Sequence, residues 1–159
     1  MRFTIYQESR IGRRATNQDR IAHCYSREAL LMLVADGMGG HLHGELAAHI
    51  AAQHITQAFQ REARPRLPDP ALFLSRAIAS AHHAILDDAL DRLLPEAPRT
   101  TLVACVVQDG AAHWARVGPQ ERPPAQAPGA VVEAFAEQRG RVRKAIGVQA
   151  KVRQAIAAL

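Results

Sequence analysis

Residues 30–48 read LLMLVADGMGGHLHGELAA, and the rest of the chain is organised around this stretch. It opens with an apolar run from Leu30 to Ala35, which is typical of a buried strand and too short for an independent helix. Asp36 stands where this strand ends, and three of the next four residues are glycine, which allows a sharp turn or a close approach of the backbone to a ligand. From Glu45 onward the apolar residues recur at helical spacing, which predicts a helix. A carboxylate at the end of a buried strand, before a glycine-rich turn, is a common oxygen ligand for a hard cation. The alternative interpretation is a tight turn in which Asp36 binds nothing.

Strand patterns occur on both sides of this stretch. The alternation in residues 3–7 predicts an N-terminal strand. Residues 21–25 predict a short strand that forms a hairpin with residues 30–35. Residues 101–107, TLVACVV, are apolar on both faces, as in a strand covered from each side. The turn signal QDG then predicts a hairpin to a returning strand at residues 111–117.

Two helices are expected between these strands. The first is predicted from about Gly44 to Ala63, where a proline-rich segment ends it. Asp69 is the predicted N-cap of the second helix, with Pro70 at the first helical position, and that helix is expected to reach about Leu93. Strands, then helices, then strands indicate an α+β fold in which both helices pack on an antiparallel sheet. The side chains predicted to be buried by this packing are Leu74, Ile78, Ile85, Val103 and Cys105.

Composition bounds the class of protein. A chain of 159 residues with 48% hydrophobic content is long enough for one globular core. It holds no apolar run of membrane-spanning length, and residues 1–10 lack the apolar centre of a secretory signal. Two cysteines are too few for a disulfide framework and fit a reducing compartment. These observations predict a cytoplasmic protein with no membrane partner.

The basic charge belongs to the end of the chain. Residues 1–118 hold 13 Arg and no Lys against 12 Asp and Glu, whereas residues 119–159 hold 7 basic residues against 3 Glu. Residues 119–130 are rich in Pro and Ala and are interpreted as a linker. Residues 131–159 are basic and rich in Ala, and they are predicted to be helical. A hypothesis for this segment is that it is a deletion or frameshift product, because its composition resembles off-frame reading of G+C-rich coding sequence.

Three motifs occur in order along residues 1–118. The first is RATNQD at residues 14–19, and the second is DGMGGH at residues 36–41 with Gly44-Glu45 after it. The third is a Thr-Thr-Leu strand followed by a strand ending in Val-Gly, within residues 99–118. In this order they resemble the motifs of the metal-dependent protein phosphatases, the type 2C serine/threonine phosphatases of bacterial type. The resemblance covers residues 1–118. It implies two antiparallel sheets packed as a sandwich and flanked by helices, of which this chain has an incomplete copy.

The resemblance also implies a function and a set of site residues. Family members hydrolyse phosphoserine and phosphothreonine in proteins, the products of Ser/Thr kinases, with two Mn²⁺ or Mg²⁺ ions. Asp36 and the backbone carbonyl of Gly37 align with the metal ligands, and Asp19 aligns with the acid that acts through a metal-bound water. Gln18 aligns with a residue that hydrogen-bonds to the ligands without binding the metal, at a position where many relatives carry Glu. Arg14 aligns with the arginine that binds phosphate.

The sequence departs from the family in its last third. No aspartate follows Asp109, whereas the family takes further metal-binding aspartates from that region. Met38 stands where some relatives carry a histidine, and Met cannot transfer a proton. We therefore expect a truncated and impaired phosphatase. One alternative is a non-catalytic remnant or a module that binds phosphorylated partners through Arg14. The other alternative is that the basic tail binds nucleic acid or an acidic surface. This function is less favoured, because residues 1–118 are nearly neutral and the excess of positive charge belongs to the tail alone.

Overall fold

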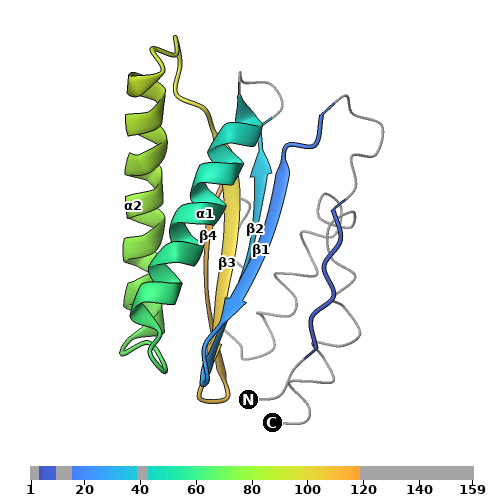
Figure 1. The fold of residues 1–159 in the computed structure, drawn as a ribbon, viewed down its shortest axis with the longest axis vertical. Helices are drawn as coiled ribbons and strands as arrows, with labels where there is room; N and C mark the ends of the chain where they lie inside the picture. The colour runs from blue at the N-terminus through green and yellow to red at the C-terminus, as the bar shows by residue number, and fades with distance from the viewer. Residues whose placement is uncertain (1–3, 10–15, 39–42, 119–159) are drawn as a thin grey trace.

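A computed structural model of the chain describes residues 4–9, 16–38 and 43–118. Within these ranges one four-stranded antiparallel sheet, in the order β1-β2-β3-β4, carries two helices on one face (Figure 1). The α+β class is confirmed, as is the order of its elements. Their bounds are β1 Asp19–Tyr25, β2 Ala29–Gly37, α1 Gly44–Glu62, α2 Pro70–Asp91, β3 Thr100–Gln108 and β4 Ala111–Val117.

The N-terminal strand is the exception among these predictions. Residues 4–9 form no strand, although they run beside β1 on the side away from the helices. The side chain of Gln7, instead of a backbone ladder, makes the contact. Its Nε2 donates to the carbonyl of Ile21 at 3.2 Å, and its Oε1 lies 2.7 Å from Nδ1 of His23. The prediction was wrong because alternation alone does not supply a partner strand for the backbone.

The sheet has two unlike faces because successive side chains of a strand point in opposite directions. On β2, Leu31, Leu33 and Ala35 belong to the core that both helices cover. Asp36 follows Ala35 and therefore points to the opposite face, together with Val34 and the other alternate residues. The residues from β3 that complete the helix-facing layer are Leu102, Ala104 and Val106.

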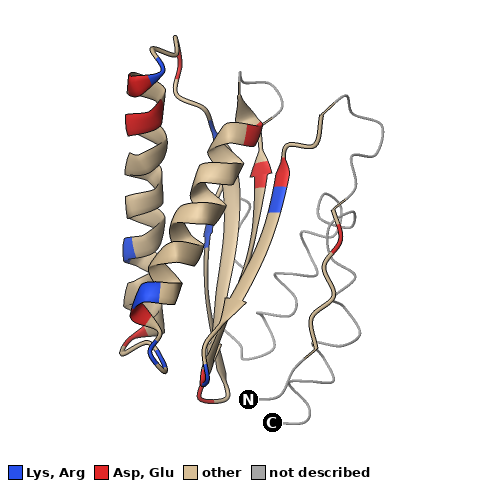
Figure 2. Ribbon diagram, viewed as in Figure 1, with Lys and Arg blue, Asp and Glu red and all other residues tan. Residues whose placement is uncertain are grey.

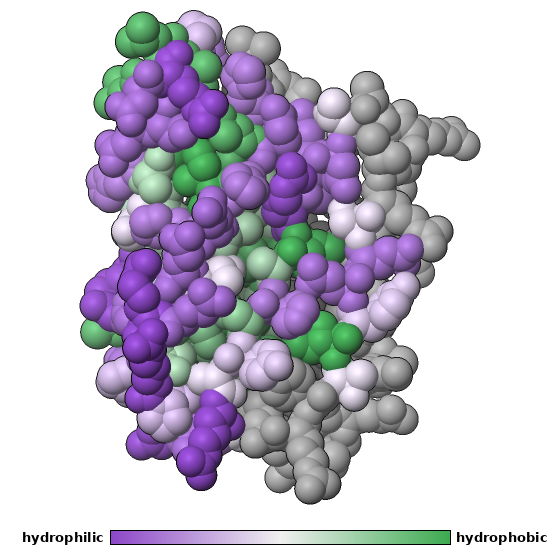
Figure 3. Space-filling model, in the orientation of Figure 1, coloured by the Kyte–Doolittle hydropathy of each residue, from purple (hydrophilic) through white to green (hydrophobic). Residues whose placement is uncertain are grey.

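The helices pack closely because their inner faces are built largely of alanine. α1 buries five alanines together with Ile55 and Phe59, and α2 buries Phe73 and Leu74. The rings of Phe59 and Phe73 meet edge to face with their centroids 5.9 Å apart. Figure 3 shows polar side chains over most of the outer helix surface, and Leu90 and Leu93 are exposed where α2 ends. Of the side chains predicted to be buried, Leu74, Ile85 and Cys105 are buried, and Ile78 and Val103 are half-buried.

Local signals account for the connections. The side chain of Asp69 accepts hydrogen bonds from the amides of Ala71 and Leu72, both at 2.9 Å, which confirms the predicted N-cap of α2. Asp109 and Gly110 join β3 to β4 with φ of 51° and 73°. Both values are left-handed, as the predicted two-residue hairpin requires.

Several predictions lie outside the described residues. They concern Arg14, the glycines at 39 and 40, the linker at 119–130 and the basic segment at 131–159. In the part of the chain that the structure describes, neither helix is both long enough and apolar enough to cross a membrane.

Candidate functional site

The candidate site is formed where β1 begins and β2 ends. In the antiparallel register Asp19 stands directly opposite Asp36. Cross-strand partners point to the same face, with their Cβ atoms about 4.5–5.5 Å apart. Both aspartates are half-buried, and both lie on the face that the helices leave uncovered. Figure 2 marks acidic residues in red at this end of the ribbons of β1, β2 and α1. The fold thus brings together two carboxylates from separate sequence motifs.

The backbone around Asp36 is held by hydrogen bonds from both neighbouring strands. On one side, the amide of Gly37 donates to the carbonyl of Gln18 at 3.1 Å. On the other, Oγ1 of Thr100 donates to the carbonyl of Asp36 at 2.9 Å, and Oγ1 of Thr101 lies 3.4 Å from the same oxygen. The sequence motif contained these threonines without indicating what they do. Their position, where β3 begins, fixes the end of β2.

Two motif glycines bring α1 against this end of β2. A Cβ built on Gly37 would lie 2.4 Å from the carbonyl oxygen of Gly44, so only glycine fits there. A Cβ on Gly44 would likewise lie 2.9 Å from the amide nitrogen of Met38. The start of α1 therefore rests on the backbone that follows Asp36. His43 precedes the helix in a left-handed conformation, with φ of 64°.

Polar side chains hold the backbone of residues 17–19, where the chain enters β1. Oδ1 of Asn17 accepts a hydrogen bond from the amide of Asp19 at 3.1 Å, and its Nδ2 donates to Oγ of Ser9 at 2.8 Å. Nη1 of Arg20 donates to the carbonyls of Asn17 at 3.0 Å and Asp19 at 2.8 Å. Asn17 and Arg20 had no predicted role. Their signal in the sequence is only that they flank Gln18 and Asp19.

The donor atoms gathered here suit a divalent cation of the Mg²⁺ or Mn²⁺ type, which prefers oxygen ligands. Asp19 and Asp36 supply carboxylates. Oε1 of Gln18 is a buried oxygen without a hydrogen-bond partner among the described residues. Within residues 4–9, 16–38 and 43–118, however, no group of three or more His, Cys, Asp and Glu is placed to hold a metal. The described residues therefore fit part of such a site.

The two cysteines are poor candidates for a nucleophile. Cys24 and Cys105 are free and buried. Burial raises the pKa of the Cys24 thiol to about 11 and that of the Cys105 thiol to about 12. Because the thiolate is the reactive form, both side chains are protonated and inert at neutral pH.

The sequence-predicted site residues have different outcomes. Asp19, Gln18, Asp36 and Gly37 are brought together, and their roles toward a metal stay predictions. Arg14 lies outside the described residues, so its contact with phosphate also stays a prediction.

Comparison with known proteins points to one family and one fold. The family model of protein phosphatase 2C matches residues 6–119. The chain is similar to the serine/threonine phosphatase PstP/Ppp of Mycobacterium tuberculosis, with 24% identity and a TM-score of 0.58, over 74% of this chain and 46% of that one. A structure of the PstP catalytic domain in complex with two manganese ions matches with 24% identity and a TM-score of 0.59, over 74% of this chain and 48% of that one.

A third solved structure, a Stage II sporulation E family protein from Thermanaerovibrio acidaminovorans, has 24% identity and a TM-score of 0.51, over 63% of this chain and 45% of that one. The chain thus spans less than half the length of each of these structures. None of the curated proteins matches it.

Proposed function

Because the chain belongs to the protein phosphatase 2C family, we propose that it is built for the metal-dependent hydrolysis of phosphoserine and phosphothreonine in proteins. The observation that carries this proposal is the placement of Asp19 opposite Asp36, with half-buried carboxylates on one face of the sheet. Its substrates would be proteins phosphorylated by Ser/Thr kinases. The two free cysteines fit a reducing compartment, which would be the cytoplasm.

Each site residue has a stated part in this proposal. Asp36 and the carbonyl of Gly37 would hold a Mn²⁺ or Mg²⁺ ion directly, and Asp19 would hold it through water. Gln18 would accept a hydrogen bond from such a water, which would satisfy its buried oxygen. Arg14 would bind two oxygens of the phosphate with its planar guanidinium. Divalent cations at such a centre lower the pKa of water and neutralise charge on the phosphoryl group.

We further propose that this polypeptide on its own is impaired as a phosphatase. Residues 110–159 contain no aspartate. One directly bound carboxylate and one carbonyl leave most coordination positions of the ion to water, so they are expected to bind a single Mg²⁺ or Mn²⁺ ion weakly. Loss of one of two metal centres should remove most of the rate, since the ions act together on the nucleophile and the phosphate.

The test combines Mn²⁺ binding, followed by electron paramagnetic resonance, with hydrolysis of an aryl phosphate. The chain is compared with Asp36→Ala and with Asp87→Ala, which removes an exposed acid on α2 as a matched control. We expect weak Mn²⁺ binding that Asp36→Ala abolishes and Asp87→Ala retains, with the same low rate in all three. Equal Mn²⁺ binding by the chain and Asp36→Ala would refute the metal site. A Mn²⁺-dependent rate that Asp36→Ala removes would instead refute the impairment.

The alternative of a phosphopeptide-binding module has the same observation behind it, the lack of aspartate after Asp109. It predicts that a phosphoserine peptide binds the chain without Mn²⁺, and that Arg14→Gln weakens this binding. Binding that requires Mn²⁺ would favour the metal-dependent function.

A further inference from the structure

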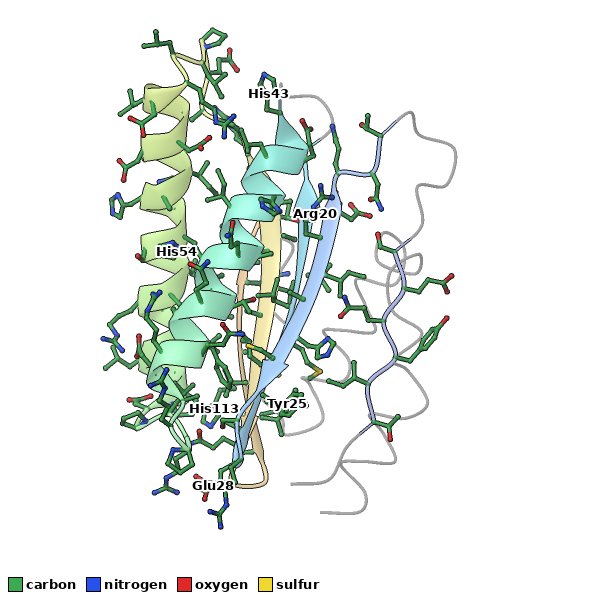
Figure 4. All side chains as sticks on the ribbon, in the orientation of Figure 1. Arg20, Tyr25, Glu28, His43, His54 and His113 are labelled. Carbon is green, nitrogen blue, oxygen red and sulfur yellow. The ribbon has the colours of Figure 1, made fainter. Side chains whose placement is uncertain are left out.

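Arg20 joins two carbonyls across the loop that presents Asp19. Its Nη1 donates to the carbonyl of Asn17 at 3.0 Å and to that of Asp19 at 2.8 Å. The two carbonyls bracket Gln18, whose own carbonyl accepts the amide of Gly37 from β2 at 3.1 Å. The backbone of residues 17–19 is therefore held by the guanidinium of Arg20 and, through the carbonyl of Gln18, by β2. Figure 4 shows Arg20 on β1, at the end of the strand where the loop begins.

The direction of the Arg20 side chain separates it from the carboxylates it supports. Arg20 pairs with Ala35 in the register, and Ala35 belongs to the core under the helices. Asp19 and Asp36 point to the opposite face of the sheet. Arg20 thus acts on the backbone of the loop from the helix side, whereas the carboxylates face away from it.

From these contacts we propose that Arg20 is a positioning residue, which fixes the backbone of Asp19 so that its carboxylate stands opposite Asp36 to bind a divalent cation. The part that concerns the cation rests on the proposed function. A hydrogen bond from a charged donor is roughly twice as strong as one from a neutral donor. Two such bonds from one guanidinium nitrogen oppose fraying of the backbone where β1 begins.

The positioning effect and the bare charge of Arg20 make opposite predictions. As a charge alone, a guanidinium near the site repels a divalent cation, so its removal would raise the affinity for Mn²⁺. As a residue that positions Asp19, Arg20 raises the affinity for Mn²⁺, and its removal lowers that affinity. Both hydrogen bonds come from Nη1, which lies one bond farther along the side chain than the Nζ of a lysine would. Arg20→Lys therefore keeps the charge but loses the reach to the two carbonyls, and Arg20→Gln loses both. These two variants therefore separate the two effects.

The first measurement needs no metal. Amide hydrogen exchange is followed by NMR in the chain and in Arg20→Lys. We expect the amides of Asp19 and Gly37 to exchange at least about five-fold faster in Arg20→Lys, because their hydrogen bonds depend on the clamped loop. The amide of Leu33, in the middle of β2, should be unchanged. Unchanged exchange at Asp19 and Gly37 would overturn the inference, whatever the metal does.

The second measurement is Mn²⁺ affinity by electron paramagnetic resonance, with Arg76→Gln as the control. Arg76 is an exposed arginine on α2 that pairs with Glu62. We expect affinity to fall about ten-fold in both Arg20→Lys and Arg20→Gln, as is usual when a group supporting a metal ligand is lost. Unchanged affinity in Arg20→Lys with raised affinity in Arg20→Gln would overturn positioning in favour of charge. If the unaltered chain binds no Mn²⁺, the proposed metal site fails, and the exchange measurement decides the role of Arg20.

Discussion

Substitution of Gly37 by alanine tests the contact that joins the end of β2 to the start of α1. The added Cβ would lie 2.4 Å from the carbonyl oxygen of Gly44 and 2.9 Å from that of Gln18. Ordinary van der Waals contact begins at 3.4 Å, so the helix must retreat by about 1 Å. Both opposing atoms are backbone, and neither can rotate away as a side chain would.

The size of the effect follows from two opposing changes in free energy. Overpacking of this kind costs about 1–3 kcal/mol, and an obstructing backbone places Gly37→Ala in the upper half of that range. Alanine also restricts the unfolded chain, which returns about 0.4–1 kcal/mol. The clash outweighs this gain, so we expect the free energy of unfolding to fall by about 1–2.5 kcal/mol. For a chain of this size, that lowers the midpoint of thermal unfolding by at least about 2 °C.

The assay is thermal and urea unfolding followed by circular dichroism, with Gly110→Asn as the control. Gly110 has open space around it and a φ of 73°, a conformation that asparagine tolerates. It lies at the opposite end of β3 from the site, so its variant should unfold close to the unaltered chain. If Gly37→Ala is as stable as the unaltered chain, the close contact between Gly37 and Gly44 is wrong, and so is the seating of α1 on the site.

Two further predictions concern the interior. Oε1 of Gln108 accepts from the buried amide of Leu67 at 2.8 Å, and Nε2 donates to the carbonyl of Leu67 at 2.9 Å. Gln108→Leu would leave that amide and that carbonyl unpaired, so it should lower the free energy of unfolding, measured in urea, by about 2–4 kcal/mol. A loss below about 0.5 kcal/mol would contradict this. Cys24 and Cys105 should resist alkylation by iodoacetamide at pH 8 in the native chain and react in urea, since burial raises their pKa to about 11 and about 12. Because these pKa values lie above the ordinary 9.0, thiols of the unfolded chain ionise first. The contribution of the thiols to stability should therefore be constant below pH 9 and be lost as the pH rises from 9 towards 12. Rapid alkylation of the native chain, or stability that rises above pH 9, would show that the thiols are not buried.

The local elements of this protein could be read from its sequence because their causes lie within a few residues. The apolar run before Asp36 specifies β2, and Asp69 followed by Pro70 specifies the start of α2. The pair Asp109-Gly110 supplies the left-handed conformation that its turn requires. Asp19 and Asp36 were identified as site residues from the motifs, which give their positions in the sequence but not the distance between them in space.

The tertiary structure alone decided which of these residues meet. A shift of one residue in the pairing of β1 with β2 would send Asp19 and Asp36 to opposite faces, and only the complete register excludes it. The contact of Gly37 with Gly44 depends on where the whole of α1 docks. Arg20 donates to the carbonyls on either side of Gln18, and no periodicity in the sequence encodes these two contacts. Sequence thus determined both helices, the strands from β1 to β4 and the kinds of donor atom, but not the fate of residues 4–9, which lack a partner strand. Packing and register determined that two carboxylates share one face.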